Sequence, residues 1–375
     1  MKYYIIAGEA SGDLHGSNLI KELKKLDAAA DVRAWGGDKM QAQGAKLVKH
    51  YKELAFMGFV EVIKHLPTIF KNLKFCKQDI LNYQPDVLIL IDYPGFNLQL
   101  VKWAKENGIK IIFYISPQVW AWKEGRVHLI KKYVDKLLVI LPFEKDFYKK
   151  YNYEVAYVGH PLVEVIEEFK QNYQLATGNR QQATSNTIAL LPGSRKQEIK
   201  RKLPVMLATT KHFPEYNFIV ARAPGITDEF YHTFLSSYKN VKTISDQTYS
   251  ILMQSKAALV TSGTATLETA LFGVPEIVCY KADEISYQIA KRLINLNFIS
   301  LVNLIMNKEV VKELIQHNLT VENLKYELHE LLTNETRIRQ IKDAFSDLKN
   351  LLSQGGNASA NAAKIIYEFI NVSGH

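Results

Sequence analysis

The feature that most constrains the fold is a repeated pattern in which a short apolar run ends in a polar turn and leads into a helix-forming segment. Residues 86–91 form one such run, and its continuous apolar character is typical of a strand buried on both faces of a parallel sheet. Similar runs occur at residues 3–7, 110–115, 136–141 and 154–158, and again at 187–191, 217–221, 241–244, 257–260 and 276–280. The pattern predicts an α/β protein with two doubly wound domains facing a cleft.

Two segments indicate where the chain passes between these domains. The sequence Gly-His-Pro-Leu at 159–162 predicts the exit from the first domain, with His160 as a hydrogen-bonded hinge residue, and the polar stretch 171–187 predicts a linker or surface loop. A Gly-Gly break at 355–356 precedes a final helix over 358–370 and would let that helix cross back to the first domain. We therefore expect one domain at 1–165 with 356–375, and a second at 166–355.

Composition excludes several classes of protein. The net charge of +9 is spread over many predicted helices rather than gathered in a tail, so an anionic substrate or an acidic membrane surface fits better than nucleic acid. The only two cysteines, Cys76 and Cys279, sit in apolar segments without metal-ligand spacing and predict free core thiols in a reducing compartment. No stretch approaches the ~20 apolar residues of a membrane span.

The stretch TSGTATLETALFGVP at 261–275 predicts a strand, a turn and a helix. Ser262, Gly263 and Thr264 form the turn, where unpaired backbone N–H groups and the helix dipole favour phosphate. Glu268, one turn into the helix, has the chemistry to accept hydrogen bonds from a sugar diol. Read alone, the stretch is equally well explained as an ordinary βα unit with Ser and Thr caps.

A second turn, at 192–196, carries cations at the start of another helix. Arg195 and Lys196 at the start of this helix favour a diphosphate there over the alternative, exposed and solvated charge. The first turn of the chain, at 8–13, differs. It lacks the dinucleotide spacing G-x-G-x-x-G, and its carboxylates Glu9 and Asp13 suit a hydroxyl-bearing ligand. Asp13 most simply caps its own helix.

Asp92 follows the buried strand 86–91 directly, at the edge where parallel sheets bind ligands. That position makes it a candidate general base, while a role in the Pro-Gly turn that follows is the alternative. Two further segments each allow two interpretations. Trp120 and Trp122 could stack on a sugar or pack in an interface. Residues 55–75 are more apolar than one core-facing stripe requires, so they form either core or a basic-rimmed surface that meets acyl chains or anionic lipid.

Taken together, the motifs resemble the lipid-A-disaccharide synthase family, glycosyltransferases of the two-Rossmann-domain (GT-B) type. The resemblance covers nearly the whole chain. It is carried by AGEASGD (7–13), MGFVEV (57–62), IDYPGFN (91–97), SPQVWAW (116–122), VGHPL (158–162), LLPGSRKQEI (190–199), SGTATLE (262–268), SLVN (300–303) and ELIQ (313–316). Several such motifs in order are far more specific than any single βα turn.

The resemblance implies an inverting transfer of diacylglucosamine from its UDP derivative to the 6-hydroxyl of 2,3-diacylglucosamine 1-phosphate, without a metal or other cofactor. It implies Asp92 as base with Glu9 nearby, and Arg195 acting on the leaving UDP. Donor contacts would come from Ser194, Arg195, Ser262, Gly263, Thr264, Glu268, Asn303, Glu313 and Gln316. Acyl chains or the membrane would meet Phe56, Met57, Phe59, Val60, Ile63, Leu66, Ile69 and Phe70.

The family is cytoplasmic or peripherally bound to the inner membrane, and a homodimer is compatible with it. Two other classes stay open. Another UDP-sugar enzyme of the same fold, an epimerase or a peptidoglycan precursor transferase, would share the nucleotide half but leave the apolar 56–70 surface without a purpose. A non-enzymatic two-domain sugar-binding protein would leave Asp92 and Arg195 unexplained.

Overall fold

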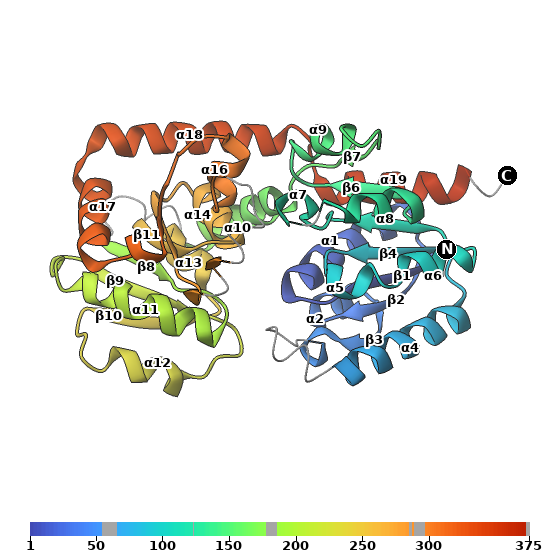
Figure 1. Cartoon of the computed structure of the whole chain (residues 1–375), viewed down its shortest axis with the longest axis horizontal. Helices are drawn as coiled ribbons and strands as arrows, with labels where there is room; N and C mark the ends of the chain where they lie inside the picture. The colour runs from blue at the N-terminus through green and yellow to red at the C-terminus, as the bar shows by residue number, and fades with distance from the viewer. Residues whose placement is uncertain (55–65, 123, 178–185, 285–286, 289–296, 373–375) are drawn as a thin grey trace. The chain divides into compact units, whose positions relative to one another are not determined.

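The computed structural model describes residues 1–54, 66–122, 124–177, 186–284, 287–288 and 297–372. The chain divides into two compact units (Figure 1). Unit 1 comprises Met1–Pro161 and Leu352–His375, and unit 2 comprises Leu162–Leu351. Unit 1 is therefore built from two separate stretches of sequence, and the second stretch carries the final helix.

Unit 1 contains a seven-stranded parallel sheet in the order β3-β2-β1-β4-β5-β6-β7. The strands are β1 (Lys2–Ala7), β2 (Asp31–Gly36), β3 (Lys46–His50), β4 (Val87–Ile91), β5 (Ile111–Tyr114), β6 (Lys136–Val139) and β7 (Ala156–Tyr157). The helices are α1 (Ala10–Leu26), α2 (Asp38–Ala42), η1 (Tyr51–Glu53), α4 (Leu66–Tyr83), α5 (Pro94–Asn97), α6 (Val101–Glu106), α7 (Val119–Trp122), α8 (Arg126–Tyr133), α9 (Glu144–Lys149) and α19 (Ala358–Val372).

The sheet of unit 1 has apolar side chains on both faces, because alternate residues of each strand point to opposite sides. Tyr4 and Ile6 join one core cluster with α4, α6 and α8, whereas Tyr3 and Ile5 join the other with α1 and α19. The final helix crosses back as expected: its buried face packs against α1 in the second cluster.

Unit 2 has a six-stranded parallel sheet in the order β10-β9-β8-β11-β12-β13. Its strands are β8 (Thr187–Leu191), β9 (Asn217–Arg222), β10 (Val241–Ser245), β11 (Ser255–Thr261), β12 (Glu276–Tyr280) and β13 (Lys312–Ile315). The helices are α10 (Pro161–Thr177), α11 (Lys196–Thr210), α12 (Asp228–Leu235), α13 (Thr248–Met253), α14 (Thr264–Leu271), α16 (Leu301–Met306), η2 (Gln316–Asn318), α17 (Val321–Thr333) and α18 (Glu335–Ser353); α10 and α18 run across the unit boundaries.

The apolar runs predict their strands well, but β2, β3 and β13 are not predicted. Each carries charged residues that interrupt the apolar pattern, and β3 and β13 are edge strands. The linker expected at 171–187 is also wrong in its first part, because α10 continues to Thr177; residues 178–185 lie outside the described residues.

Asp13 requires a second correction. We expected it to cap its own helix, but α1 already begins at Ala10 and Asp13 lies inside it. Its buried carboxylate instead accepts hydrogen bonds from the backbone N–H groups of Gly37 (2.8 Å), Lys39 (3.1 Å) and Met40 (3.0 Å), and so caps the start of α2.

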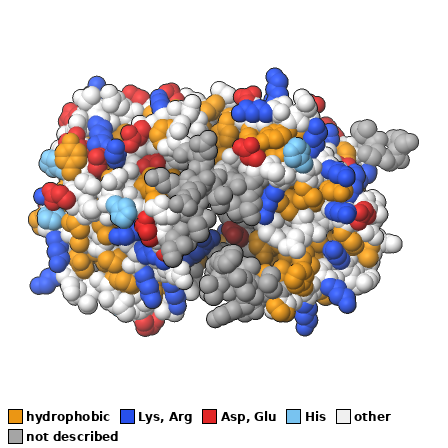
Figure 2. All heavy atoms as spheres, in the orientation of Figure 1, with side chains coloured by type: hydrophobic (Ala, Val, Ile, Leu, Met, Phe, Trp, Pro, Cys, Tyr) orange, Lys and Arg blue, Asp and Glu red, His pale blue; other side chains and the backbone are white. Residues whose placement is uncertain are grey.

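Two observations concern surfaces. Among the described helices, none combines the length and apolar character needed to cross a membrane. On the face shown in Figure 2, Lys and Arg side chains are scattered rather than gathered into one patch, as the sequence predicts.

Candidate active site

In unit 1, the predicted carboxylates lie beyond the carboxyl ends of two central strands of the sheet. Strands β1 and β4 are neighbours, with Ala7 paired to Ile91, so the segments that follow them emerge side by side. These segments carry Glu9 and Asp92. Glu9 is exposed at the N-cap position of α1, and Asp92 is partly buried directly after β4.

The turn that carries Asp92 has an unusual backbone. Asp92 (φ 42°) and Tyr93 (φ 51°) are consecutive non-glycine residues in the left-handed region. The side-chain amide of Asn97 donates to the carbonyl of Asp92 (2.7 Å) and that of Ile91 (3.4 Å). The ring of Tyr93 covers Gly8 so closely that a Cβ there would lie 2.4 Å from ring carbons. Asn97 thus holds the turn by hydrogen bonds, and Gly8 leaves room for the Tyr93 ring beside Asp92. The sequence did not indicate either of these supporting roles.

The environment of Asp92 suits a base. Burial, together with the negative charge of Glu9, raises the pKa of Asp92 to about 6, although a backbone hydrogen bond at Tyr93 opposes the change. A carboxylate with a pKa near neutrality can take a proton from a hydroxyl more readily than an ordinary aspartate can.

In unit 2, six of the nine predicted donor residues gather around one pocket of about 460 Å³. The residues are Ser194, Arg195, Ser262, Gly263, Thr264 and Glu268. They meet because β8 and β11 are paired neighbours, so the turns that follow these strands lie next to each other at the carboxyl edge. Two separate βα turns therefore form one site.

The geometry of both turns favours an anion. Arg195 stands at the N-cap of α11 and Gly263 at the N-cap of α14, and both residues line the pocket, so it lies at the N-terminal ends of two helices. Gly263 has φ 133° and ψ −160°, a conformation essentially restricted to glycine. The Ser262 hydroxyl donates to the carbonyl of Ile299 (2.9 Å), which ties the second turn to the segment before α16.

Glu268 lies in the same pocket, and its carboxylate accepts a hydrogen bond from the Tyr249 hydroxyl (3.0 Å). Burial raises the pKa of Glu268, and the hydrogen bond from Tyr249 opposes that change. The carboxylate oxygens remain suitable acceptors for two neighbouring hydroxyl groups, as a ribose offers.

Lys202 is a polar residue of this region that sequence reasoning missed. It lies on α11 with only 3% of its surface exposed, and its ammonium donates to the Thr261 hydroxyl directly behind the pocket. The sequence does contain an indication that Lys202 is buried. Lys202 lies in the apolar stripe of α11 beside Ile199 and Leu203, where a charged side chain needs a buried partner.

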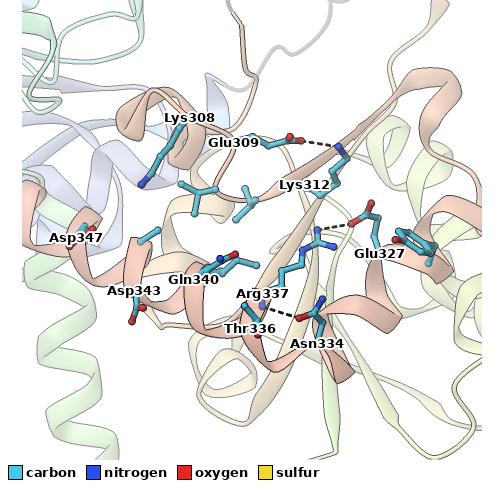
Figure 3. A pocket seen from close by; sticks show the side chains of 15 residues that line it. Lys308, Glu309, Lys312, Glu327, Asn334, Thr336, Arg337, Gln340, Asp343 and Asp347 are labelled. Atoms are coloured by element: carbon cyan, nitrogen blue, oxygen red, sulfur yellow. Dashed lines mark hydrogen bonds and ion pairs between the residues drawn. The ribbon is translucent and has the colours of Figure 1, made fainter.

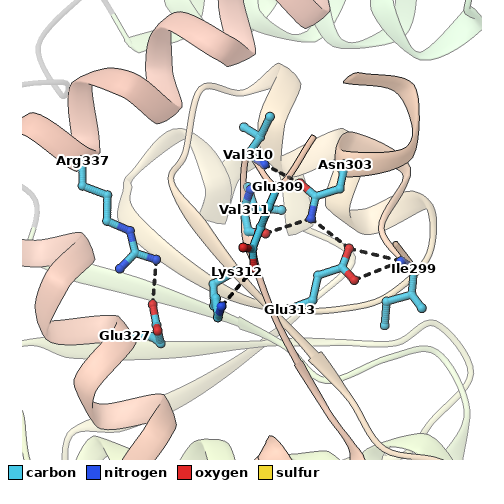
Figure 4. Close-up of polar contacts among 9 residues, drawn as sticks. All are labelled: Ile299, Asn303, Glu309, Val310, Val311, Lys312, Glu313, Glu327 and Arg337. Atoms are coloured by element: carbon cyan, nitrogen blue, oxygen red, sulfur yellow. Dashed lines mark hydrogen bonds and ion pairs between the residues drawn. The ribbon is translucent and has the colours of Figure 1, made fainter. Parts of the chain in front are cut away.

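Asn303, Glu313 and Gln316, also expected at the donor, make contacts within the chain. Asn303 is fully buried: its amide oxygen accepts from the N–H groups of Val310 and Val311, and its amide nitrogen donates to the Val311 carbonyl and to Glu313 (Figure 4). Both ends of this amide are thereby satisfied.

Glu313 continues the same network. Its carboxylate accepts from the N–H groups of Ile299 (3.0 Å) and Ser300 (2.9 Å). Because the Ile299 carbonyl also accepts from Ser262, the network supports the turn at Ser262–Thr264. Gln316 holds the backbone of Ala282 in a similar way. The donor contacts of these three residues stay predictions, and the structure shows a supporting role.

A larger groove, of about 1050 Å³, lies elsewhere in unit 2 between the segment 308–312 and helices α17 and α18 (Figure 3). Two of its cations already pair with carboxylates of the groove: Lys312 with Glu309 (3.0 Å) and Arg337 with Glu327 (2.6 Å). None of the predicted site residues lines it. Six of the predicted donor residues line the smaller pocket instead.

The predicted acyl surface is described only in part. Phe56, Met57, Phe59, Val60 and Ile63 lie outside the described residues, as does the side chain of Leu66. Ile69 is half-buried against the core, whereas Phe70 is 62% exposed. Trp120 is buried, with its ring edge-on to Phe143 at 4.9 Å; the side chain of Trp122 is not described.

A family model described as lipid-A-disaccharide synthetase matches residues 3–367. The chain belongs to this family. The lipid-A-disaccharide synthase of Geobacter metallireducens is 38% identical over 98% of this chain and 96% of its own length, and that of Nitrosococcus oceani is 38% identical over 94% and 92%. The chain is therefore a glycosyltransferase, a hexosyltransferase of lipid A disaccharide synthesis.

Solved structures show the same fold at low identity. The UDP-GlcNAc 2-epimerase from Neisseria meningitidis has a TM-score of 0.67 at 14% identity, covering 99% of both chains. That from Methanocaldococcus jannaschii has a TM-score of 0.66 at 15% identity, covering 98% of this chain and all of its own. These likenesses, with the two parallel sheets, confirm the GT-B fold of two Rossmann-like domains.

Proposed function

We propose that this synthase joins UDP-2,3-diacylglucosamine to 2,3-diacylglucosamine 1-phosphate by an inverting transfer, which yields the β-1,6-linked disaccharide 1-phosphate and UDP. The observation that carries the proposal is the pocket of unit 2, where two βα turns bring Ser194, Arg195 and Ser262–Thr264 together around a space suited to a nucleoside diphosphate.

In the proposed reaction, Asp92 accepts the proton of the acceptor 6-hydroxyl while the hydroxyl oxygen attacks C1 of the donor sugar. The bond between C1 and the diphosphate oxygen breaks, and its electron pair leaves with UDP. The raised pKa of Asp92 supports its role as base. Because attack comes from the face opposite the leaving group, the new linkage has inverted configuration.

The leaving diphosphate gains negative charge as the bond breaks. Arg195 and the backbone N–H groups at the starts of α11 and α14 supply positive potential in the same pocket. We therefore propose that the transfer proceeds without a metal ion, so a chelator should leave the rate unchanged. Among the described residues, no group of three or more His, Cys, Asp or Glu is arranged to hold a metal.

The test is Asp92→Asn, with UDP release and disaccharide formation followed by mass spectrometry. Turnover should fall by about 10²–10⁴-fold, the usual effect of removing a general base, while UDP binding stays intact. Asp86→Asn is the matched control, because Asp86 precedes the same strand at its opposite end. A loss smaller than about tenfold would remove Asp92 from the base role, and absence of a disaccharide in the wild type would refute the function.

We also propose that α4 contacts acyl chains or the membrane surface. Phe70 and Phe75 are 62% and 49% exposed, and the exposed Lys71 and Lys74 lie between them on the same side of the helix. Aromatic rings with adjacent cations suit the boundary of an anionic bilayer. The double variant Phe70→Ser/Phe75→Ser should sediment less with vesicles that contain anionic lipid, and Leu175→Ser, at an exposed apolar residue of unit 2, is the control. Equal sedimentation of all three would contradict the contact.

A further inference from the structure

Lys202 combines deep burial with a position directly behind the donor pocket. Its side chain leaves α11 and reaches the carboxyl end of β11, where its ammonium donates to the hydroxyl of Thr261. The same ammonium lies 4.0 Å from a carboxylate oxygen of Glu198, and a Cβ on Gly193 would meet it at 3.5 Å. Thr261, Glu198 and Gly193 all line the pocket.

Glu198 is shared between two cations. Its other oxygen lies 3.4 Å from the guanidinium of Arg195, while Lys202 approaches from the buried side. Arg195 is 55% exposed in its side chain, and Lys202 only 4%. Arg195 is therefore the partner that can turn toward a ligand, and Lys202 is the partner that stays with Glu198.

This arrangement matters because the pocket must accept a dianion although a carboxylate lines it. If Arg195 turned to a diphosphate and Glu198 had no second cation, an uncompensated negative charge would face the ligand. Burial lowers the pKa of Lys202, and the charge of Glu198 opposes that change, as expected for a cation held in place by its carboxylate.

We infer that Lys202 is a positioning residue for donor binding, which keeps Glu198 neutralised so that Arg195 is released to the diphosphate. The inference rests on the proposed function of this pocket and concerns how the nucleotide is held. Lys202 contacts no substrate atom itself. It acts through Glu198 and Thr261, and its effect should therefore depend on the phosphate charge of the ligand.

The experiment measures binding of UDP and of uridine by calorimetry. Lys202→Met should weaken UDP binding by about ten- to hundredfold, but uridine binding by less than about threefold, because only the diphosphate requires Arg195. Adding Glu198→Gln to Lys202→Met should restore UDP affinity to within about fivefold of wild type, because the carboxylate that retains Arg195 is gone. A purely structural lysine would not be rescued in this way.

Two further variants keep the test decisive if Lys202→Met does not fold. Glu198→Gln alone leaves Lys202 in place and should tighten UDP binding, because it removes a negative charge from the pocket. Lys170→Met is the matched control: Lys170 is a partly buried lysine that donates to the carbonyl of Leu271 at the other end of α14, so its loss should leave the UDP-to-uridine affinity ratio unchanged.

The outcomes separate the two proposals. If the wild type binds no UDP, the proposed function of the pocket falls, and the inference falls with it. If the wild type binds UDP but Lys202→Met weakens UDP and uridine equally, or Glu198→Gln weakens UDP binding, the role assigned to Lys202 is overturned while the donor site stands.

Discussion

Asp92 and Tyr93 adopt a backbone conformation that costs about 1–3 kcal/mol for each non-glycine residue. Local contacts offset this cost: Asn97 donates to the carbonyl of Asp92, and the Tyr93 ring packs on Gly8 and stacks with Phe96. The turn also holds a carboxylate in a partly buried place near Glu9. Both features reduce stability, and the proposed role of Asp92 as a base would account for their presence, because the requirements of catalysis and of folding can oppose each other.

The difference in unfolding free energy between the wild type and Asp92→Asn should therefore depend on pH. Because burial raises the pKa of Asp92 from 3.8 to about 6, the native state binds its proton more tightly than the unfolded state does. The contribution to stability is therefore fully present below about pH 4 and is lost as the pH rises through about 6. Asp92→Asn should gain about 2–3 kcal/mol relative to wild type between pH 4 and pH 8, measured by urea unfolding at each pH. A difference that does not change with pH would show that Asp92 ionises in the native state as freely as in the unfolded chain.

At the scale of elements, a feature can be predicted from the sequence when the residues that form it are close together in the chain. The turns after β4, β8 and β11 are predictable, because Asp92 and Ser262–Thr264 follow apolar strands directly and Arg195 follows one after three turn residues. The supports behind them are not. Asp13 bonds to residues 24–27 positions away and Lys202 to one 59 positions away, and only the folded sheet brings those partners together. The same holds for β13, whose charged residues hide an edge strand.

The brace formed by α16 and β13 gives a prediction at this scale. Asn303→Ala removes four hydrogen bonds from a fully buried site and leaves the N–H groups of Val310 and Val311 without their side-chain acceptor. We expect a loss of about 2–4 kcal/mol in unfolding free energy, together with weaker UDP binding, because the brace reaches Ser262 through Glu313 and Ile299.

The control for this brace is Asn323→Ala, which removes an exposed asparagine from the start of α17. It should lower stability by no more than about 1 kcal/mol and leave UDP affinity unchanged. If Asn303→Ala lowered stability without any change in UDP affinity, the expected connection from this brace to the turn at Ser262–Thr264 would be wrong.

For the whole molecule, the main feature is that unit 1 is completed by a helix from the far end of the sequence. Ala362, Ala363 and Ile366 of α19 are fully buried in the same cluster as Leu19 and Ile20 of α1. Hydrogen bonds join the segment where the chain leaves unit 1 to the segment where it returns. The Tyr157 hydroxyl donates to the Leu352 carbonyl (3.2 Å), and the Asn361 side-chain amide donates to the Val158 carbonyl (3.1 Å).

Replacement of one buried residue in α19 should therefore destabilise unit 1 selectively. Ile366→Ala should lower its unfolding free energy by about 2–5 kcal/mol, whereas Lys364→Ala, on the exposed face of the same helix, should change it by about 0.5 kcal/mol or less. Calorimetry with and without UDP assigns the transitions, because ligand bound in unit 2 raises only the melting temperature of that unit. If Ile366→Ala lowered the melting temperatures of both units equally, the conclusion that the two units have independent cores would be wrong.

The discontinuity of unit 1 also sets an order of events on the ribosome. Because α19 is translated after all of unit 2, the apolar surface that α19 covers in unit 1 stays exposed on the nascent chain until unit 2 has been synthesised. Apolar surface exposed for that time invites aggregation or chaperone capture. A stalled or truncated translation product of this enzyme should therefore be far more aggregation-prone than its finished form.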